Sequence, residues 1–358
     1  MDPQPDINMD IEYKKYKSVE NRNQCPTKEV DKEHFIEPDL ACFLSIFQQL
    51  FKPTPRTFLE MFNCVHCNAC KTSNSRYYLK RTLHNSDFKS RATEVMLESY
   101  RKYDTPFNQA KYRFKVPEEV PKDSDTLLFM GCLSTIKIPA YTLNAIKYLL
   151  SKGVDFTVLD QEICCGIPLV DSGEQEMLES LMEKNRTLFN NYKKIICLCP
   201  ACFEFFNHFY TGIKPPVAYI TDYLQPLSKK RTETLSIQHL CQLMYRGFKH
   251  VIPQVEQVLR DSGYQIMDNE KHWCCGGGMG IMHIEKTIEK IARIRVNDFH
   301  GELLTTYCSS CYHVLKLFTQ KEKISPKLVD IFTLLTWILA LIRVLEKGKK
   351  YVDRKKEK

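Results

Sequence analysis

Gly131-Cys132, Cys164-Cys165-Gly166 and Cys199-Pro200-Ala201-Cys202 are three separate parts of one cysteine pattern in this 358-residue chain. The pattern is a single cysteine, a cysteine pair and a Cys-x-x-Cys motif, with 31 and 33 residues in the gaps. It occurs again as Cys241, Cys274-Cys275 and Cys308-Ser309-Ser310-Cys311, with gaps of 32 and 32 residues. Ten of the sixteen cysteines belong to these two copies, so we expect two equivalent sites that each collect five sulfurs.

The sequence between the cysteines alternates between apolar strand patterns and helical patterns. In the first copy we expect strands at 126–130, 154–159 and 194–199 and helices at 140–150, 174–190 and 201–210. In the second copy the expected strands are 235–239, 264–267 and 303–307, and the expected helices are 252–261, 287–299 and 312–319. Corresponding cysteines lie 109 or 110 residues apart, which indicates a tandem duplication of one α/β domain with parallel-sheet βαβ units.

Most of these cysteines follow the carboxyl end of a predicted strand. At that edge of an open parallel sheet the loops converge, and helix N-termini present N–H groups that can stabilise sulfide and thiolate. A glycine follows each cysteine pair, at Gly166 and at 276–278, where the chain must turn for both sulfurs to reach one site. Five thiolates exceed the four ligands of a structural zinc ion, so the pattern favours a larger inorganic cluster.

The length and the cysteine usage indicate metal or redox chemistry rather than disulfides. A chain of 358 residues can form proper cores without cross-links, and no stretch resembles a secretory signal. We therefore expect a cytoplasmic protein, either free or at the inner face of the membrane, in which thiols persist. The apolar segment 328–345 is interrupted by Asp330 and Arg343 and is too short to span a membrane, so it predicts a buried or amphipathic closing helix.

The double five-cysteine pattern resembles the duplicated cysteine-rich CCG domains in the B-type and D-type subunits of heterodisulfide reductases. Their relatives include the iron–sulfur subunits of glycolate, lactate and anaerobic glycerol-3-phosphate dehydrogenases, and the resemblance covers about residues 64 to 335. It implies that each site holds a noncubane [4Fe-4S] cluster and that disulfide cleavage occurs between the two. The implied ligands are Cys132, Cys164, Cys165, Cys199 and Cys202 for one cluster, and Cys241, Cys274, Cys275, Cys308 and Cys311 for the other.

One departure from the family pattern surrounds the second single cysteine. The family usually has a His-Asp-Pro-Cys-His-like run there, whereas this chain has Gln238-His239-Leu240-Cys241-Gln242, which leaves the substrate open. His239 and His272 flank expected ligands and could deliver protons, although structural roles are the simpler interpretation. Cys197 is expected to be a small buried apolar residue of its strand.

A third group of cysteines, Cys64, Cys67 and Cys70, lies nearer the N-terminus. It reproduces the first three ligands of a ferredoxin C-x2-C-x2-C-x3-C-P run, but Asn74 stands at the fourth position. A [4Fe-4S] cluster could take its remaining ligand from Cys25 or Cys42, and a [3Fe-4S] cluster needs three ligands only. A zinc site and an empty, degenerate site are the alternatives. In the fused members of the resembled family, an electron-relay module of this kind precedes the CCG pair.

These patterns divide the chain into five parts. We expect an extended or disordered arm at 1–37, a small helical ferredoxin-like module at 38–122, CCG domains at 123–232 and 233–342, and a basic tail at 343–358. The net charge of +8 comes largely from that tail, so we expect no nucleic-acid binding.

The first functional hypothesis is a redox subunit that cleaves or forms a disulfide of thiol cofactors or protein dithiols. The alternative is an electron-transfer subunit that passes electrons from a flavoprotein dehydrogenase to quinone, and a structural zinc scaffold is the non-redox hypothesis. The glycines at 276–280 follow a cysteine pair instead of opening a nucleotide-binding turn after a strand, so neither redox hypothesis has a flavin site in this chain. Both therefore need a flavoprotein or another electron-donor subunit, through which any peripheral membrane association would occur.

Overall fold

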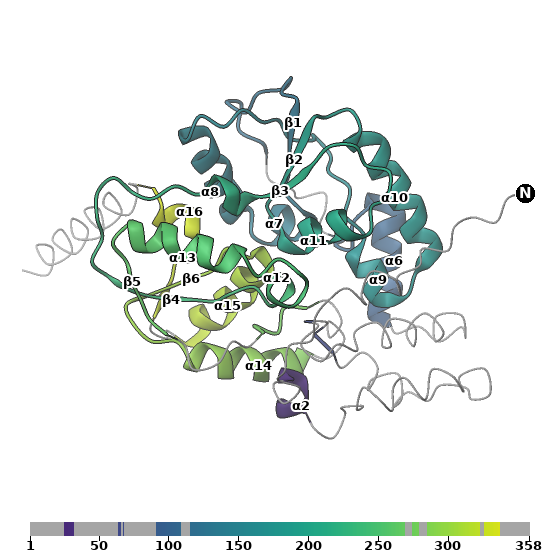
Figure 1. Ribbon diagram of the computed structural model, residues 1–358. Coiled ribbons are helices and arrows are strands. Elements are labelled where there is room, and N and C mark those ends of the chain that lie inside the picture. The colour runs from purple at the N-terminus through teal and green to yellow at the C-terminus, as the bar shows by residue number, and fades with distance from the viewer. Residues whose placement is uncertain are drawn as a thin grey trace, which may run out of the picture.

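The computed structural model describes residues 25–31, 64–65, 67, 91–108, 115–268, 274–278, 285–322 and 326–336. Within these residues the chain forms two α/β halves that lie side by side, the first in blue and teal and the second in green and yellow (Figure 1). Several expected features lie outside the described residues, namely most of the arm at 1–37, the predicted site residues Cys42, Cys70 and His272, and the basic tail at 343–358.

The first half is built on a parallel sheet with the strand order β1-β2-β3. The strands are β1 (Thr126–Phe129), β2 (Lys194–Cys197) and β3 (Val217–Tyr219), and β1 and β2 each have the burial pattern of a strand covered on both faces. Leu127 also forms a parallel bridge with Thr157 on the other side of β1. The strand expected at 154–159 is thus reduced to one bridge, because the segment reaches β1 only at Thr157.

The second half repeats this arrangement with the strand order β5-β4-β6-β7. Its strands are β4 (Thr234–Ile237), β5 (Gln265–Ile266), β6 (Leu303–Thr305) and β7 (Lys327–Leu328). If the bridge at Thr157 is counted as the equivalent of β5, the two sheets have the same strand order. The register also agrees, since Leu127 pairs with Ile195 in the first sheet and Leu235 pairs with Leu303 in the second. This topology confirms the predicted tandem α/β fold with parallel sheets.

Helices cover both sheets. In and before the first half they are α2 (Pro26–Val30), α6 (Arg91–Tyr103), α7 (Cys132–Lys137), α8 (Pro139–Ser151), α9 (Ile167–Ser172), α10 (Gln175–Phe189) and α11 (Pro200–His208). After the 3₁₀ helix η2 (Ile220–Tyr223), the second half has α12 (Cys241–Tyr245), α13 (Val251–Asp261), α14 (Glu285–Asn297), α15 (Ser309–Glu322) and α16 (Ile331–Leu334).

Sequence analysis identified the long helices but missed the short ones. The helices α7, α9 and α12 have five or six residues, which is too short for a helical hydrophobic period to be visible. The closing helix expected from 328 is also different, because Leu328 belongs to β7 and α16 begins after Asp330. Asp330 caps this helix by accepting a hydrogen bond from the Thr333 amide at 2.9 Å.

The two halves share one continuous apolar core. The ring of Tyr141 in α8 lies 5.0 Å from that of Tyr312 in α15 and 5.3 Å from that of Phe332 in α16. Asn144 donates a hydrogen bond of 3.0 Å to the carboxylate of Asp330 across the same boundary. Buried aromatic contacts and a partly buried polar contact thus fix the halves against each other.

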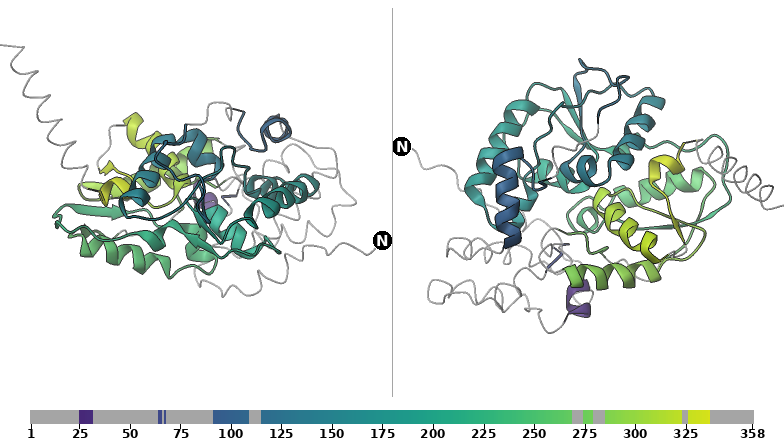
Figure 2. Two further views of the ribbon diagram at one scale, coloured as in Figure 1. Left: turned by 90° about the horizontal axis from the view of Figure 1, so that it is seen from above. Right: turned by 180° about the vertical axis from the view of Figure 1, so that it is seen from behind.

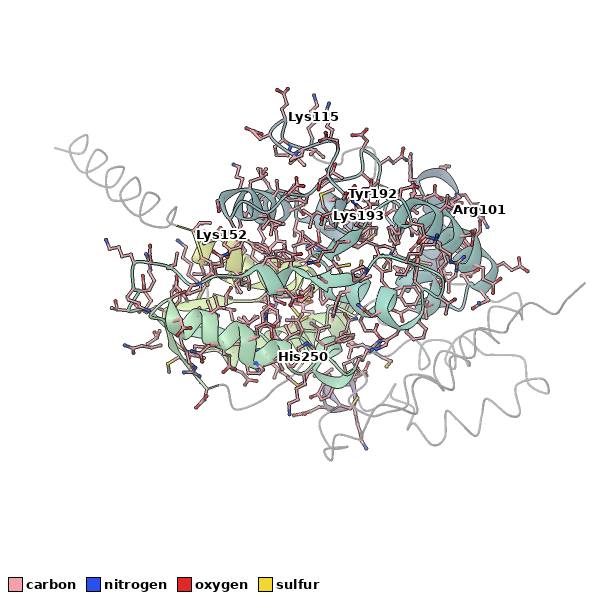
Figure 3. All side chains as sticks on the ribbon, turned by 45° about the horizontal axis from the view of Figure 1, so that its top comes forward. Arg101, Lys115, Lys152, Tyr192, Lys193 and His250 are labelled. Carbon is pink, nitrogen blue, oxygen red and sulfur yellow. The ribbon has the colours of Figure 1, made fainter. Side chains whose placement is uncertain are left out.

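The outer surface carries charged side chains on several sides. Figure 3 shows Arg101, Lys115 and Lys152 at separate places around the first half. Among the residues described here, no helix is long and apolar enough to cross a membrane.

Candidate metal centres

The first site gathers its five cysteines from the loops and helices that follow the strands of the first sheet. Cys132 begins α7, and its sulfur lies 3.5 Å from the sulfur of Cys164. Cys199 immediately precedes α11, and Cys202 in the first turn of that helix lies next to both Cys199 and Cys165. Cys132 is half-buried and the other four are buried, so the site is closed to bulk water on most sides.

The second site has the same construction. The sulfurs of Cys241 and Cys274 are 3.5 Å apart, and those of Cys275 and Cys311 are 3.2 Å apart. The amide of Cys311 donates a hydrogen bond of 3.3 Å to the sulfur of Cys308. All five cysteines of this copy line one small cavity. The structure therefore brings together each predicted set of five.

A glycine turn follows each cysteine pair, as the sequence predicts. Gly166 has a φ of 105° and Gly276 a φ of 85°, which an L-residue rarely adopts. A Cβ atom at Gly166 would lie 3.4 Å from the side chain of Leu181 in α10, and one at Gly276 would lie 3.4 Å from Ile291 in α14. Each turn thus packs closely against the helix that follows it.

Some cysteines at each site favour the thiolate, which is the form that binds metal. Burial raises the pKa of Cys164, but hydrogen bonds from neighbouring thiols outweigh it and hold the pKa well below the usual value of a thiol. Hydrogen bonds from Cys274 and a second thiol likewise lower the pKa of Cys275. The pKa of Cys199 falls to about 7, chiefly because of Cys202.

Three polar side chains support the first site and were missed in the sequence. The Tyr100 hydroxyl in α6 donates a hydrogen bond of 3.3 Å to the sulfur of Cys164. The Asn185 amide donates to the Cys164 carbonyl at 2.8 Å, and the Tyr210 hydroxyl donates to the Cys165 carbonyl at 2.6 Å. They come from α6, α10 and the segment after α11, with no local motif, so only the folded chain places them together.

The N-terminal cysteine segment lies against the second site. Cys64 and Cys67 are buried, and Cys67 packs in one small apolar cluster with Cys274 and Ile291. Cys25 immediately precedes α2, which packs on α14 and lies at its end in Figure 1 and in the right view of Figure 2. Cys70 lies outside the described residues, so a cluster at this segment stays a prediction.

Two other residues that the sequence analysis considered, Cys197 and His239, are buried in the structure. Cys197 is buried in β2, as expected for a small apolar residue, and burial raises the pKa of its thiol. His239 is also buried, with its Nδ1 3.1 Å from the Tyr307 hydroxyl and its Nε2 3.2 Å from a Glu256 carboxylate oxygen. The partners of His239 fit the structural role that sequence analysis favoured.

The residues at these sites fit a cluster with bridging sulfide better than a single ion. Among the described residues, five cysteines and neither histidine nor carboxylate line the second cavity, and the Gly277 amide donates to the Cys275 sulfur at 3.4 Å. In the described part of the chain, no group of three or more His, Cys, Asp or Glu side chains is arranged to hold one metal ion. The thiols lie 3.2–3.5 Å apart, so they must separate to bind a cluster. The fit rests on donor chemistry, and the ligand assignment stays a prediction.

Each half contains a segment that matches a known domain family. The CCG cysteine-rich domain matches residues 126–207 and 236–316. A crystal structure of a hypothetical protein from Helicobacter pylori has a similar fold, with a TM-score of 0.52 at 9% identity, over 85% of this chain and 68% of that chain. The domain boundaries at 123–232 and 233–342 remain predictions, since the matches cover only parts of them.

Several curated proteins are similar at modest identity. The B-type subunit of the fumarate reductase (CoM/CoB) of Methanothermobacter marburgensis is 26% identical over 58% of this chain and 45% of that protein. The EtfAB:quinone oxidoreductase of Syntrophomonas wolfei is 29% identical over 55% and 31%. The D-type subunit of the dihydromethanophenazine:CoB–CoM heterodisulfide reductase of Methanosarcina acetivorans is 23% identical over 62% and 61%. The chain spans about half the length of several curated relatives that it matches. It thus contains two CCG cysteine-rich domains and is related to iron–sulfur proteins and oxidoreductase subunits.

Proposed function

We propose that this chain is the iron–sulfur subunit of a heterodisulfide reductase-like redox complex, which cleaves or forms a disulfide of thiol cofactors or protein dithiols. Each five-cysteine set, as assigned above, holds one noncubane [4Fe-4S] cluster. When bound, the clusters supply or accept single electrons. The similarity to the D-type subunit of a heterodisulfide reductase supports this proposal.

The observation that carries the proposal is that the two cysteine sites adjoin the contact between the halves. The helix α7, which begins at Cys132, packs against α15, which begins just after Cys308. The helix α11, which follows Cys199, packs against α12, which begins at Cys241. The Ser309 hydroxyl of the second half also contributes to the low pKa of Cys199 in the first.

This arrangement suits a reaction that needs two electrons at one bond. Reductive cleavage of R–S–S–R′ consumes two electrons and two protons and yields R–SH and R′–SH. Two one-electron sites on either side of the boundary between the halves can each deliver one electron to one sulfur of the disulfide. The burial of the cysteines limits access of water to these sites. A flavoprotein or another donor subunit supplies the electrons, and a third cluster at Cys64, Cys67 and Cys70 relays them.

The test is anaerobic purification followed by iron and sulfide analysis and electron paramagnetic resonance. We expect about eight or more irons per chain. A new paramagnetic signal should form when candidate thiols are added under oxidising conditions. Iron and sulfide with no response to any dithiol or thiol cofactor would overturn the disulfide chemistry, and zinc without sulfide would overturn the cluster assignment.

Matched cysteine variants assign the clusters to the two sites. Cys165→Ala and Cys275→Ala should each remove one cluster and leave the other. Cys197→Ala is the control, because Cys197 is equally buried but belongs to the strand core. A loss of iron in the control equal to that in Cys165→Ala would contradict the assignment.

The second candidate is an electron-transfer subunit without a thiol substrate. The similarity to the EtfAB:quinone oxidoreductase of Syntrophomonas wolfei favours it. In that case the clusters are reduced and reoxidised reversibly by a partner flavoprotein and a quinone analogue, and thiols leave the paramagnetic signals unchanged.

A further inference from the structure

The duplication places different residues at one equivalent position beside the two sites. Asn185 in α10 and Arg295 in α14 are 110 residues apart, the same separation as the cysteine pairs. Each stands four residues after one of the side chains that a Cβ at the glycine turn would contact, Leu181 in the first half and Ile291 in the second. Residues four apart share one face of a helix. A neutral amide therefore occupies the position beside the first site that a guanidinium occupies beside the second.

Arg295 is a buried cation close to the second site. Its side chain is 1% exposed, and its Nε donates a hydrogen bond of 2.6 Å to the side-chain oxygen of Gln238. Burial lowers the pKa of this guanidinium, while Asp298 and the Cys275 thiolate are among the groups that favour its charged form. Asp298 lies 3.6 Å from the guanidinium and is 21% exposed, so this ion pair lies toward the solvent side of the buried arginine. An arginine stays charged under these conditions.

The first site has a buried group of the opposite sign. Glu162 is 4% exposed, and its carboxylate accepts hydrogen bonds of 2.6 Å from the amides of Met130 and Gly131. These amides directly precede Cys132, so the carboxylate lies beside the start of the first site. The position equivalent to Glu162 in the second half lies outside the described residues.

We propose that Arg295 beside the second site and Glu162 beside the first give the two clusters unequal reduction potentials, with the second cluster the more easily reduced. This inference rests on the proposed assignment of one cluster to each CCG domain. A cation stabilises the added electron of a reduced cluster and an anion opposes it, and this interaction is strong where water is excluded. The N-terminal cysteine segment packs on the second site. The second cluster, which we expect to be reduced first, is therefore also the one that lies next to the expected electron relay.

The test is a redox titration of the full holoprotein, followed by electron paramagnetic resonance, with Cys275→Ala identifying the signal of the second cluster. Arg295→Gln should make reduction of the second cluster about tenfold less favourable, which corresponds to a reduction potential lower by about 59 mV for one electron. Arg295→Lys keeps the charge and should shift it by less than half as much. Arg293→Gln is the matched control, because Arg293 lies on the same helix but is 45% exposed and pairs with Glu289.

Glu162→Gln tests the inference independently and should raise the first potential without changing the second, even if Arg295→Gln fails to fold. Unchanged potentials in folded Arg295→Gln, or in Glu162→Gln, would overturn the inference. If Cys165→Ala and Cys275→Ala do not each remove one signal, the cluster assignment itself has failed. The two failures are therefore distinguishable.

Discussion

Gly131 provides the sharpest test of how the first site is built. It directly precedes α7 and Cys132 with φ 87° and ψ 144°, a backbone region almost restricted to glycine. A non-glycine residue there costs about 1–3 kcal/mol of folding free energy. A Cβ atom at this position would also stand 3.1 Å from the Cβ of Cys199 and 3.6 Å from the sulfur of Cys202. Gly131→Ala should therefore strain the backbone and displace two expected ligands together.

Gly153→Ala separates these two effects. Gly153 also has a positive φ, 67°, but nothing lies within 4 Å of a Cβ atom there. Gly153→Ala should lose about 1–2 kcal/mol of stability from backbone strain alone and keep its full iron content. Gly131→Ala should lose stability similarly and, in addition, lose the iron and sulfide of one cluster.

The assay is iron and sulfide per chain together with urea unfolding of both variants. The unfolding midpoint at constant slope reports the strain, and the metal analysis reports the displacement of the cysteines. Full iron content in both Gly131→Ala and Gly153→Ala would refute the claim that the Cys199-Pro200-Ala201-Cys202 segment must approach the backbone at Gly131. Loss of iron in both would show that backbone strain, not the cysteine contact, is decisive.

Three further variants test other contacts. Glu204→Gln should cost about 3–5 kcal/mol in urea unfolding at pH 7, because it breaks the buried 3.1 Å pair with Arg246 between the halves. Burial raises the Glu204 pKa, but Arg246 and His208 together outweigh burial, so the folded pKa lies below its usual value. The stabilisation from ionised Glu204 is therefore present above pH 4.5 and is lost as the pH falls further, and this loss should be missing from the variant's acid unfolding curve. Tyr100→Phe removes the hydrogen bond to the Cys164 sulfur and should lower the potential of the first cluster alone in a redox titration. Gly278→Ala should release the N-terminal cysteine segment and increase its cleavage by a protease, while both CCG clusters remain.

The fold and the cysteine sites could be predicted because they depend on sequence spacing. Equal gaps between cysteines require equal loops, and equal loops require the same order of strands and helices in both halves. The strand at 154–159 could not be predicted correctly, because an apolar run does not reveal whether a neighbouring strand lies beside its whole length. Tyr100 and Glu162 carry no local signal either, since each contacts a site across many residues of sequence.

The two repeats share their cysteines but differ in the residues that follow each cysteine pair. Gly166 is followed by Ile167 and Pro168 in the first repeat, whereas the second has Gly277 and Gly278 at the equivalent positions. A Cβ at Gly278 would overlap the carbonyl oxygen of Val65, so only glycine lets the N-terminal segment pass there. Proline at the first site excludes the same approach. The duplicated α/β domain thus supplies two similar cysteine sites. The residues that differ between the repeats allow the N-terminal segment to pack on the second site and not on the first.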